Sequence, residues 1–126
     1  LYFAKSSLNW DNGGVAFIDP NKELDKSNWT LGRMWKITCE QYEEVRVQEC
    51  KNWYNHEIYL GKENGFPIRT ITNKEILTPN NQPSEMYLKT IALGLKETYN
   101  LTNEQIGKYL MKKGNFGNYW KMPPRI

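Results

Sequence analysis

The sequence is poor in the residues that usually build metal centres and nucleophilic triads. Its 126 residues include one histidine, His56, and two cysteines, Cys39 and Cys50. A metal site that needs two or three histidines from one chain is therefore excluded, and the cysteines lack the spacing of zinc ligands. A Ser-His-Asp triad would have to use His56, and the chain has no nucleophile-elbow sequence. We expect neither a metal nor a cofactor, and a Cys50–His56 pair is a less favoured alternative.

Long hydrophobic runs are also missing. No apolar run approaches the roughly 20 residues that a membrane-spanning helix needs, so we expect no membrane contact. If Cys39 and Cys50 lie at the two ends of one helix, they are roughly 16 Å apart, too far for a disulfide. A reducing, cytoplasmic location is therefore expected. The 17 basic and 14 acidic residues give a formal charge of +3, which requires neither nucleic acid nor a membrane as partner.

Hydrophobic periodicity and turn signals outline the elements that are present. Apolar stretches predict strands at 1–8, 15–18 and 31–37 and a hairpin formed by 57–60 and 67–72. Thr38, Ser84 and Thr102 are each followed by a helical pattern, and Thr38 and Thr102 have a glutamine three residues later, as in a capping box. The order of strands, helix, hairpin and two helices predicts an α+β fold with a mostly antiparallel sheet. We expect one domain over residues 1–126, with an irregular tail at 115–126.

The helix after Thr38 carries the residue of greatest chemical interest. Tyr42, Val45 and Glu49 recur at spacings of three and four and share one helix face. If Tyr42 and Val45 enter the core, Glu49 is carried toward it. A carboxylate shielded from water in this way is poised for proton transfer near neutral pH. The alternative is that Glu49 caps the helix end or forms a salt bridge.

Several stretches, taken in order, resemble the γ-glutamylcyclotransferase-like (AIG2-like) family and cover roughly residues 1 to 110. The matching residues are Ser7, Trp10, Gly13-Gly14-Val15-Ala16, Leu31-Gly32-Arg33-Met34-Trp35-Lys36-Ile37, Gln48-Glu49, Tyr54, Pro83-Ser84, Tyr87, Ile91, Gly94 and Glu97. The resemblance implies an α/β roll around a small, mostly antiparallel barrel with flanking helices and one pocket. It also implies conversion of a γ-glutamyl amide to 5-oxoproline and a free amine, as in glutathione-related metabolism.

This reaction needs no protein nucleophile, because the substrate's own α-amino group attacks its γ-carbonyl. The protein holds the reacting conformation and moves a proton. The resemblance implies Glu49 as the acid and base, and Gly13 and Gly14 as places of close backbone approach. Tyr54 and Tyr87 would line the pocket, with core packing as the alternative for both. Arg69 would either clamp a substrate carboxylate or point to solvent.

The sequence also departs from the family pattern. No Tyr-Gly-Ser-Asn loop is present, so we expect the domain to be incomplete at its N-terminus and the substrate site to be affected. Cys50 follows Glu49 where the family often has glycine. A non-catalytic relative that binds a small molecule or has a regulatory role is therefore an alternative. A nucleic-acid-associated domain using the basic, aromatic stretch 112–121 is less favoured, and a homodimer is left open.

Overall fold

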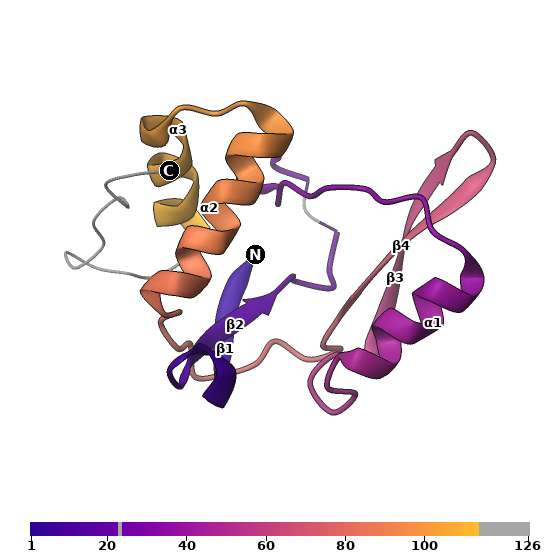
Figure 1. Ribbon diagram of the computed structural model, residues 1–126, viewed down its shortest axis with the longest axis horizontal. Helices are drawn as coiled ribbons and strands as arrows, with labels where there is room; N and C mark the ends of the chain where they lie inside the picture. The colour runs from indigo at the N-terminus through magenta and orange to yellow at the C-terminus, as the bar shows by residue number, and fades with distance from the viewer. Residues whose placement is uncertain (23, 114–126) are drawn as a thin grey trace. The chain divides into compact units, whose positions relative to one another are not determined.

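The computed structural model describes residues 1–22 and 24–113, which divide into two compact units. Unit 1 comprises the described residues of 1–17, 23–31 and 77–126, and unit 2 comprises 18–22 and 32–76. The elements in chain order are β1 (Tyr2–Ser7), β2 (Gly13–Phe17), α1 (Cys39–Gln48), β3 (His56–Glu63), β4 (Phe66–Thr72), α2 (Glu85–Tyr99) and α3 (Asn103–Lys113), with 3₁₀ turns at Leu8–Trp10 and Lys26–Asn28 (Figure 1).

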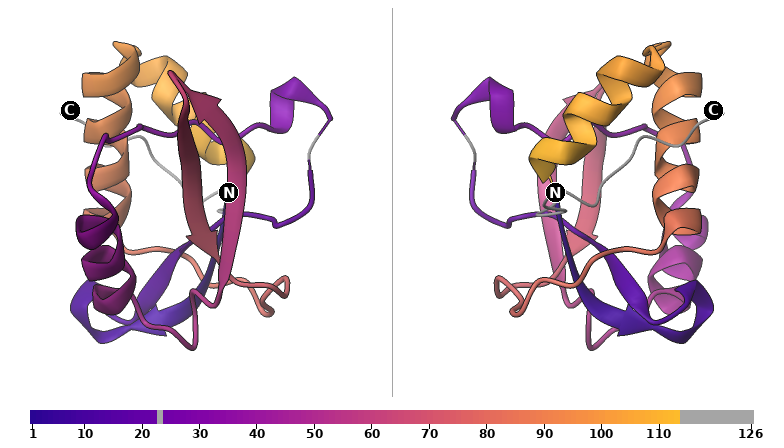
Figure 2. Two further views of the ribbon diagram at one scale, coloured as in Figure 1. Left: turned by 90° about the vertical axis from the view of Figure 1, so that its right-hand side faces the viewer. Right: turned by 90° about the vertical axis from the view of Figure 1, so that its left-hand side faces the viewer.

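Unit 1 contains an apolar core between one hairpin and two helices. β1 and β2 pair antiparallel, with an irregularity in register between Ala4 and Ser7. The helices α2 and α3 supply most of the buried side chains, and α3 is inclined to α2 (Figure 2). The core cluster consists of Phe3, Leu88, Ala92, Leu95, Ile106 and Leu110. The predicted amphipathic pattern of α2 is confirmed, because Leu88, Ala92 and Leu95 are its buried residues.

Unit 2 is built on a second hairpin and has little buried surface. β3 and β4 pair antiparallel in the register His56–Thr72 to Glu63–Phe66 and form a twisted ribbon (Figure 2). Thr72 and Asn73 are the buried residues among the described part of this unit, and α1 has none. The Thr72 hydroxyl donates to the Ile18 carbonyl oxygen at 2.6 Å and accepts from the Ile18 N–H at 3.1 Å. These two hydrogen bonds join the short segment 18–22 to the end of β4.

The predicted helix starts are confirmed. The Thr38 hydroxyl accepts from the Gln41 N–H, and the Gln41 side chain accepts from the Thr38 N–H, which completes a capping box on α1. Thr102 and Gln105 make the same reciprocal pair at the start of α3. At α2 the Ser84 hydroxyl accepts from the Tyr87 N–H. Each cap satisfies backbone donors that the first helical turn leaves without a partner.

The α+β class is confirmed, but two finer predictions differ from the structure. Residues 31–37 form no strand, and the whole stretch is exposed. Its alternating Leu31, Trp35 and Ile37 match the strand period, yet no neighbouring strand of the described chain pairs with it. The strands of the described residues form two separate two-stranded sheets, with no closed barrel among them. Among residues 1–22 and 24–113, no helix is long and apolar enough to cross a membrane.

Candidate functional site

The carboxylate predicted to act as acid and base lies at the surface. Glu49 is the C-cap residue of α1, where its N–H donates to the Val45 carbonyl oxygen at 3.1 Å. Its side chain is exposed, and Val45 on the same face is 43% exposed. The expectation that this face enters a core is wrong, because only Tyr42 of the three is partly buried. Glu49 therefore lacks the desolvation that its proposed role required.

Gly13 and Gly14 are needed by the packing of unit 1. A Cβ at Gly14 would fall 2.0 Å from the Asn81 carbonyl oxygen, and one at Gly13 would fall 2.5 Å from the Ser84 nitrogen. The Gly14 N–H donates to the Gln82 carbonyl oxygen at 3.0 Å. The group that approaches these glycines is thus the chain's own segment 81–84, which leads into α2.

Tyr87 lies at the same junction and belongs to the packing around the core. Its hydroxyl accepts a hydrogen bond from the Ala16 N–H at 2.8 Å. Its ring meets Phe3 and Trp10 edge to face, with centroids 6.2 and 4.9 Å away. These contacts join β1, β2 and α2, which agrees with the packing alternative stated for this residue.

Tyr54 and Arg69 belong to unit 2. Tyr54 is partly buried in the turn after α1, where its N–H donates to the Cys50 carbonyl oxygen at 2.8 Å. The Arg69 Nε lies 3.8 Å from Glu57 Oε1, and its guanidinium lies 5.9 Å from the ring centroid of Tyr42. Arg69 is therefore paired within the chain and is not left to solvent alone. Of the predicted site residues, unit 1 contains Gly13, Gly14 and Tyr87, and unit 2 contains Glu49, Tyr54 and Arg69.

Glu57 is the centre of a polar cluster that was not predicted from the sequence. The Tyr42 hydroxyl donates to Glu57 Oε2 at 2.6 Å, and Arg46 Nη1 lies 3.6 Å from the same oxygen. Partial burial, and then the hydrogen bond to the Glu57 carboxylate, raise the pKa of Tyr42 to about 12. The cluster joins α1 to β3 and β4 of unit 2. No spacing in the sequence indicates it, because its members come from three elements.

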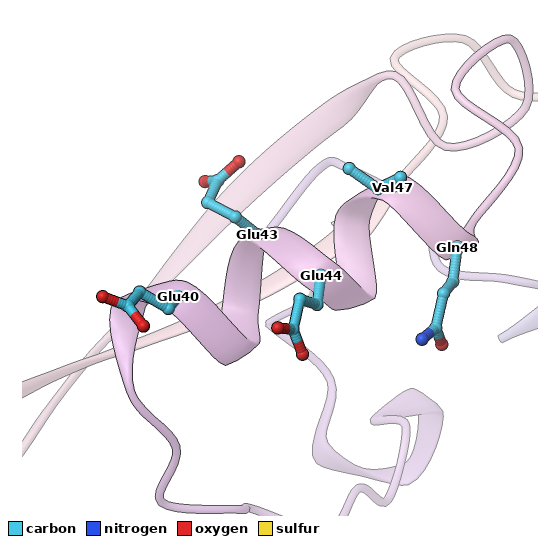
Figure 3. A pocket seen from close by; sticks show the side chains of 5 residues that line it. All are labelled: Glu40, Glu43, Glu44, Val47 and Gln48. Carbon is cyan, nitrogen blue, oxygen red and sulfur yellow. The ribbon is translucent and has the colours of Figure 1, made fainter.

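A shallow, open site lies along one face of α1. Glu40, Glu43, Glu44, Val47 and Gln48 line an open depression of about 390 Å³, and all five come from this one helix (Figure 3). We call these residues the acidic face of α1. Within the described part of the chain, none of the three glutamates forms an ion pair. Glutamates at these spacings repel one another and weaken an isolated helix by a few tenths of a kcal/mol per pair.

Unit 2 also exposes a set of large apolar and basic side chains. It consists of Arg33, Met34, Trp35, Lys36 and Ile37 with Phe66 of β4, and we call it the basic aromatic surface. Trp35 is 69% exposed, Met34 63% and Phe66 55%. The Lys36 Nζ lies 4.5 Å from the Phe66 ring centroid, and the Arg33 guanidinium lies 4.3 Å from that of Trp35. Met34, Trp35, Ile37 and Phe66 are all large hydrophobic side chains exposed to solvent.

The described residues bring together no group of three or more His, Cys, Asp and Glu that could hold a metal ion. Of the remaining residues, Glu23 is the one with such a side chain, because residues 114–126 contain none of these four types. The predicted use of the basic aromatic tail falls largely on residues 114–121, which lie outside the described part.

Comparison with known proteins gives one informative match. The chain is 28% identical to histone deacetylase 5 of Arabidopsis thaliana over an alignment of 152 residues. The alignment covers 89% of this chain and 23% of the deacetylase, so the chain spans about a quarter of the curated relative it matches. No family model matches the chain. No solved structure matches it.

This match contradicts the predicted function. A protein named for removing acetyl groups from histones points away from cyclisation of γ-glutamyl amides. The predicted conversion of a γ-glutamyl amide to 5-oxoproline is therefore wrong. The physical reason is visible at Glu49, since an exposed carboxylate at a helix end lacks the shielding on which the acid–base role depended.

Proposed function

We propose that this chain is a non-catalytic accessory segment of a histone-deacetylase-related protein, and that its role is to bind another protein. The proposal depends on how much of each chain the alignment covers. Almost the whole chain aligns, but with less than a quarter of the deacetylase. A segment of that size is what a separate accessory part of a larger enzyme would provide.

The distribution of side chains supports a binding role over a catalytic one. Deacetylation hydrolyses an amide, and proteins do this with a metal-activated water or an activated nucleophile. The described residues of this chain offer no gathered metal-ligand set, and the two cysteines are exposed at opposite ends of α1. The basic aromatic surface, by contrast, presents large apolar side chains to solvent, as a protein-binding surface does.

The experiment uses the deacetylase and its aligned stretch. The intact Arabidopsis enzyme and a version lacking the stretch that aligns with this chain are compared on an acetyl-lysine histone peptide. We expect both to release acetate at similar rates, and the 126-residue chain alone to release none above buffer. Loss of hydrolysis in a truncated enzyme that still melts cooperatively would place the stretch in the catalytic part and contradict the proposal.

We also propose a finer description of the fold, an α/β roll. This proposal concerns the fold and not the activity. Between Ser7 and Glu97, the residues that match the γ-glutamylcyclotransferase-like family occur in the family's order, which supports a related α/β roll. The tight approach of Gly13 and Gly14 to segment 81–84 agrees with it.

A further inference from the structure

Unit 2 carries two exposed surfaces of opposite charge that do not meet within one copy. The basic aromatic surface contains Arg33 and Lys36, and the acidic face of α1 contains Glu40, Glu43 and Glu44. Within the described residues, no ion pair joins the two sets. Each cation also lies over an aromatic ring, Arg33 over Trp35 and Lys36 over Phe66.

We propose that these two surfaces bind each other between two copies of the chain. This inference rests on the proposed binding role and names the partner. Each copy lays its residues 33–37 along the acidic face of the partner copy's α1, and because both surfaces belong to unit 2, a two-fold axis repeats the contact.

The dimensions of the two surfaces agree. α1 has ten residues and is about 15 Å long. Residues 33–37, in an extended conformation, reach at most about 17 Å. An extended five-residue segment can therefore follow nearly the whole helix.

Charge and apolarity also agree. Arg33 and Lys36 would meet three glutamates that have no cation of their own among the described residues. Val47 is 69% exposed at one end of the acidic face and offers an apolar contact to Met34 or Trp35. The contact would relieve the repulsion among the glutamates, and covering the indole and thioether groups would remove apolar surface from water.

The test is sedimentation equilibrium of residues 1–126 over a wide range of protein concentration. We expect a reversible monomer–dimer equilibrium that weakens as salt is raised. Arg33→Glu with Lys36→Glu is expected to weaken dimerisation at least about tenfold, since like charges then face each other. Glu43→Lys with Glu44→Lys is expected to weaken it to a similar extent.

The combination of all four substitutions decides whether the surfaces touch. It restores opposite charges with reversed signs, so dimerisation is expected to return to within about threefold of the original chain. Lys74→Glu with Lys89→Glu is the matched control and gives the same charge change as Arg33→Glu with Lys36→Glu. Lys74 follows β4 and Lys89 lies on α2; both are exposed and belong to neither surface. Circular dichroism of each variant confirms that the fold is retained.

Three results would overturn the inference. One is a chain that stays monomeric at every concentration, which would assign the surfaces to a partner of other chemistry. Another is a dimer that is indifferent to both charge reversals. The third is a loss in each reversal that the combination does not repair. None of these results bears on acetate release by the truncated deacetylase, so failure here and failure of the proposed function are distinguishable.

Discussion

The two units use their apolar residues in opposite ways. Unit 1 buries Phe3, Leu88, Ile106 and Leu110 to 3% exposure or less, and all nine buried hydrophobic side chains of the described chain belong to it. Unit 2 leaves Met34, Trp35, Val47 and Phe66 more than half exposed. Burial of apolar area is the main source of folding stability. Unit 1 therefore contains the buried core of the described chain, although it also leaves Leu8, Leu24 and Met86 more than half exposed. Unit 2 has exposed apolar side chains and no buried hydrophobic one among its described residues.

The sharpest way to test this contrast is to remove one aliphatic side chain from each unit. Ile106→Ala leaves a cavity at a fully buried position of α3 and is expected to cost about 2–5 kcal/mol of unfolding free energy. Val47→Ala, at a position 69% exposed on α1, is expected to change it by less than about 0.5 kcal/mol. Urea denaturation followed by circular dichroism measures both. Similar losses in the two variants would refute the contrast.

A glycine pair tests the same contrast at the backbone. Gly14→Ala places a methyl group against the Asn81 carbonyl oxygen and is expected to cost about 1–3 kcal/mol through forced displacement of segment 81–84. Gly32→Ala is the control, because no atom of the described residues other than its immediate chain neighbours lies within 4 Å of the position a Cβ would take. The melting temperature should fall only for Gly14→Ala. An unchanged value in both would mean that segment 81–84 does not pack on β2 as described.

The two capping boxes compare a helix with buried residues and a helix without them. Removing a threonine cap costs about 1 kcal/mol. Because α1 buries no residue, Thr38→Ala should raise amide exchange throughout α1 by about fivefold. Thr102→Ala should affect mainly the first turn of α3, since Ile106 and Leu110 anchor the rest. Hydrogen exchange resolved by peptide measures both. Equal effects along the two helices would contradict the difference in anchoring.

The smallest expected effect is on the pH dependence of stability and concerns the polar cluster around Glu57 in unit 2. Burial and the Glu57 carboxylate raise the pKa of Tyr42 to about 12, above its ordinary value of 10.0. Between these values the unfolded chain releases the Tyr42 proton and the folded chain keeps it, so this contribution to stability is lost as pH rises through the window. The Tyr42→Phe variant has no hydroxyl proton to release, so its unfolding free energy lacks this pH dependence. Unfolding free energies of both chains from pH 9 to 12 should converge, and parallel curves would exclude the effect.

Local signals in the sequence were enough to predict most elements of the fold. The capping boxes at Thr38 and Thr102 and the helical face of α2 depend on neighbours within a few residues, and the structure contains all three. Residues 31–37 alternate like a strand, but a strand also needs a partner at the right distance. Because pairing is non-local, the pattern could not show that this stretch stays exposed.

The candidate site failed for a related reason. Periodicity placed Tyr42, Val45 and Glu49 on one face, but periodicity does not say what that face meets. The cluster of Tyr42, Arg46, Glu57 and Arg69 depends on the docking of α1 against β3 and β4, and no spacing along the chain records this. Gly13 and Gly14 were correctly read as places of close approach, yet the approaching segment is 81–84, far away in the sequence.

The account depends most on unit 2 being the surface where this chain meets a protein partner, with a second copy as that partner. Hydrogen exchange of the chain at low and at high protein concentration tests this directly. We expect the amides of residues 33–48 to gain protection as the concentration rises, while those of α2 and α3 remain unchanged. Concentration-dependent protection in α2 or α3, or in no part of the chain, would contradict the account.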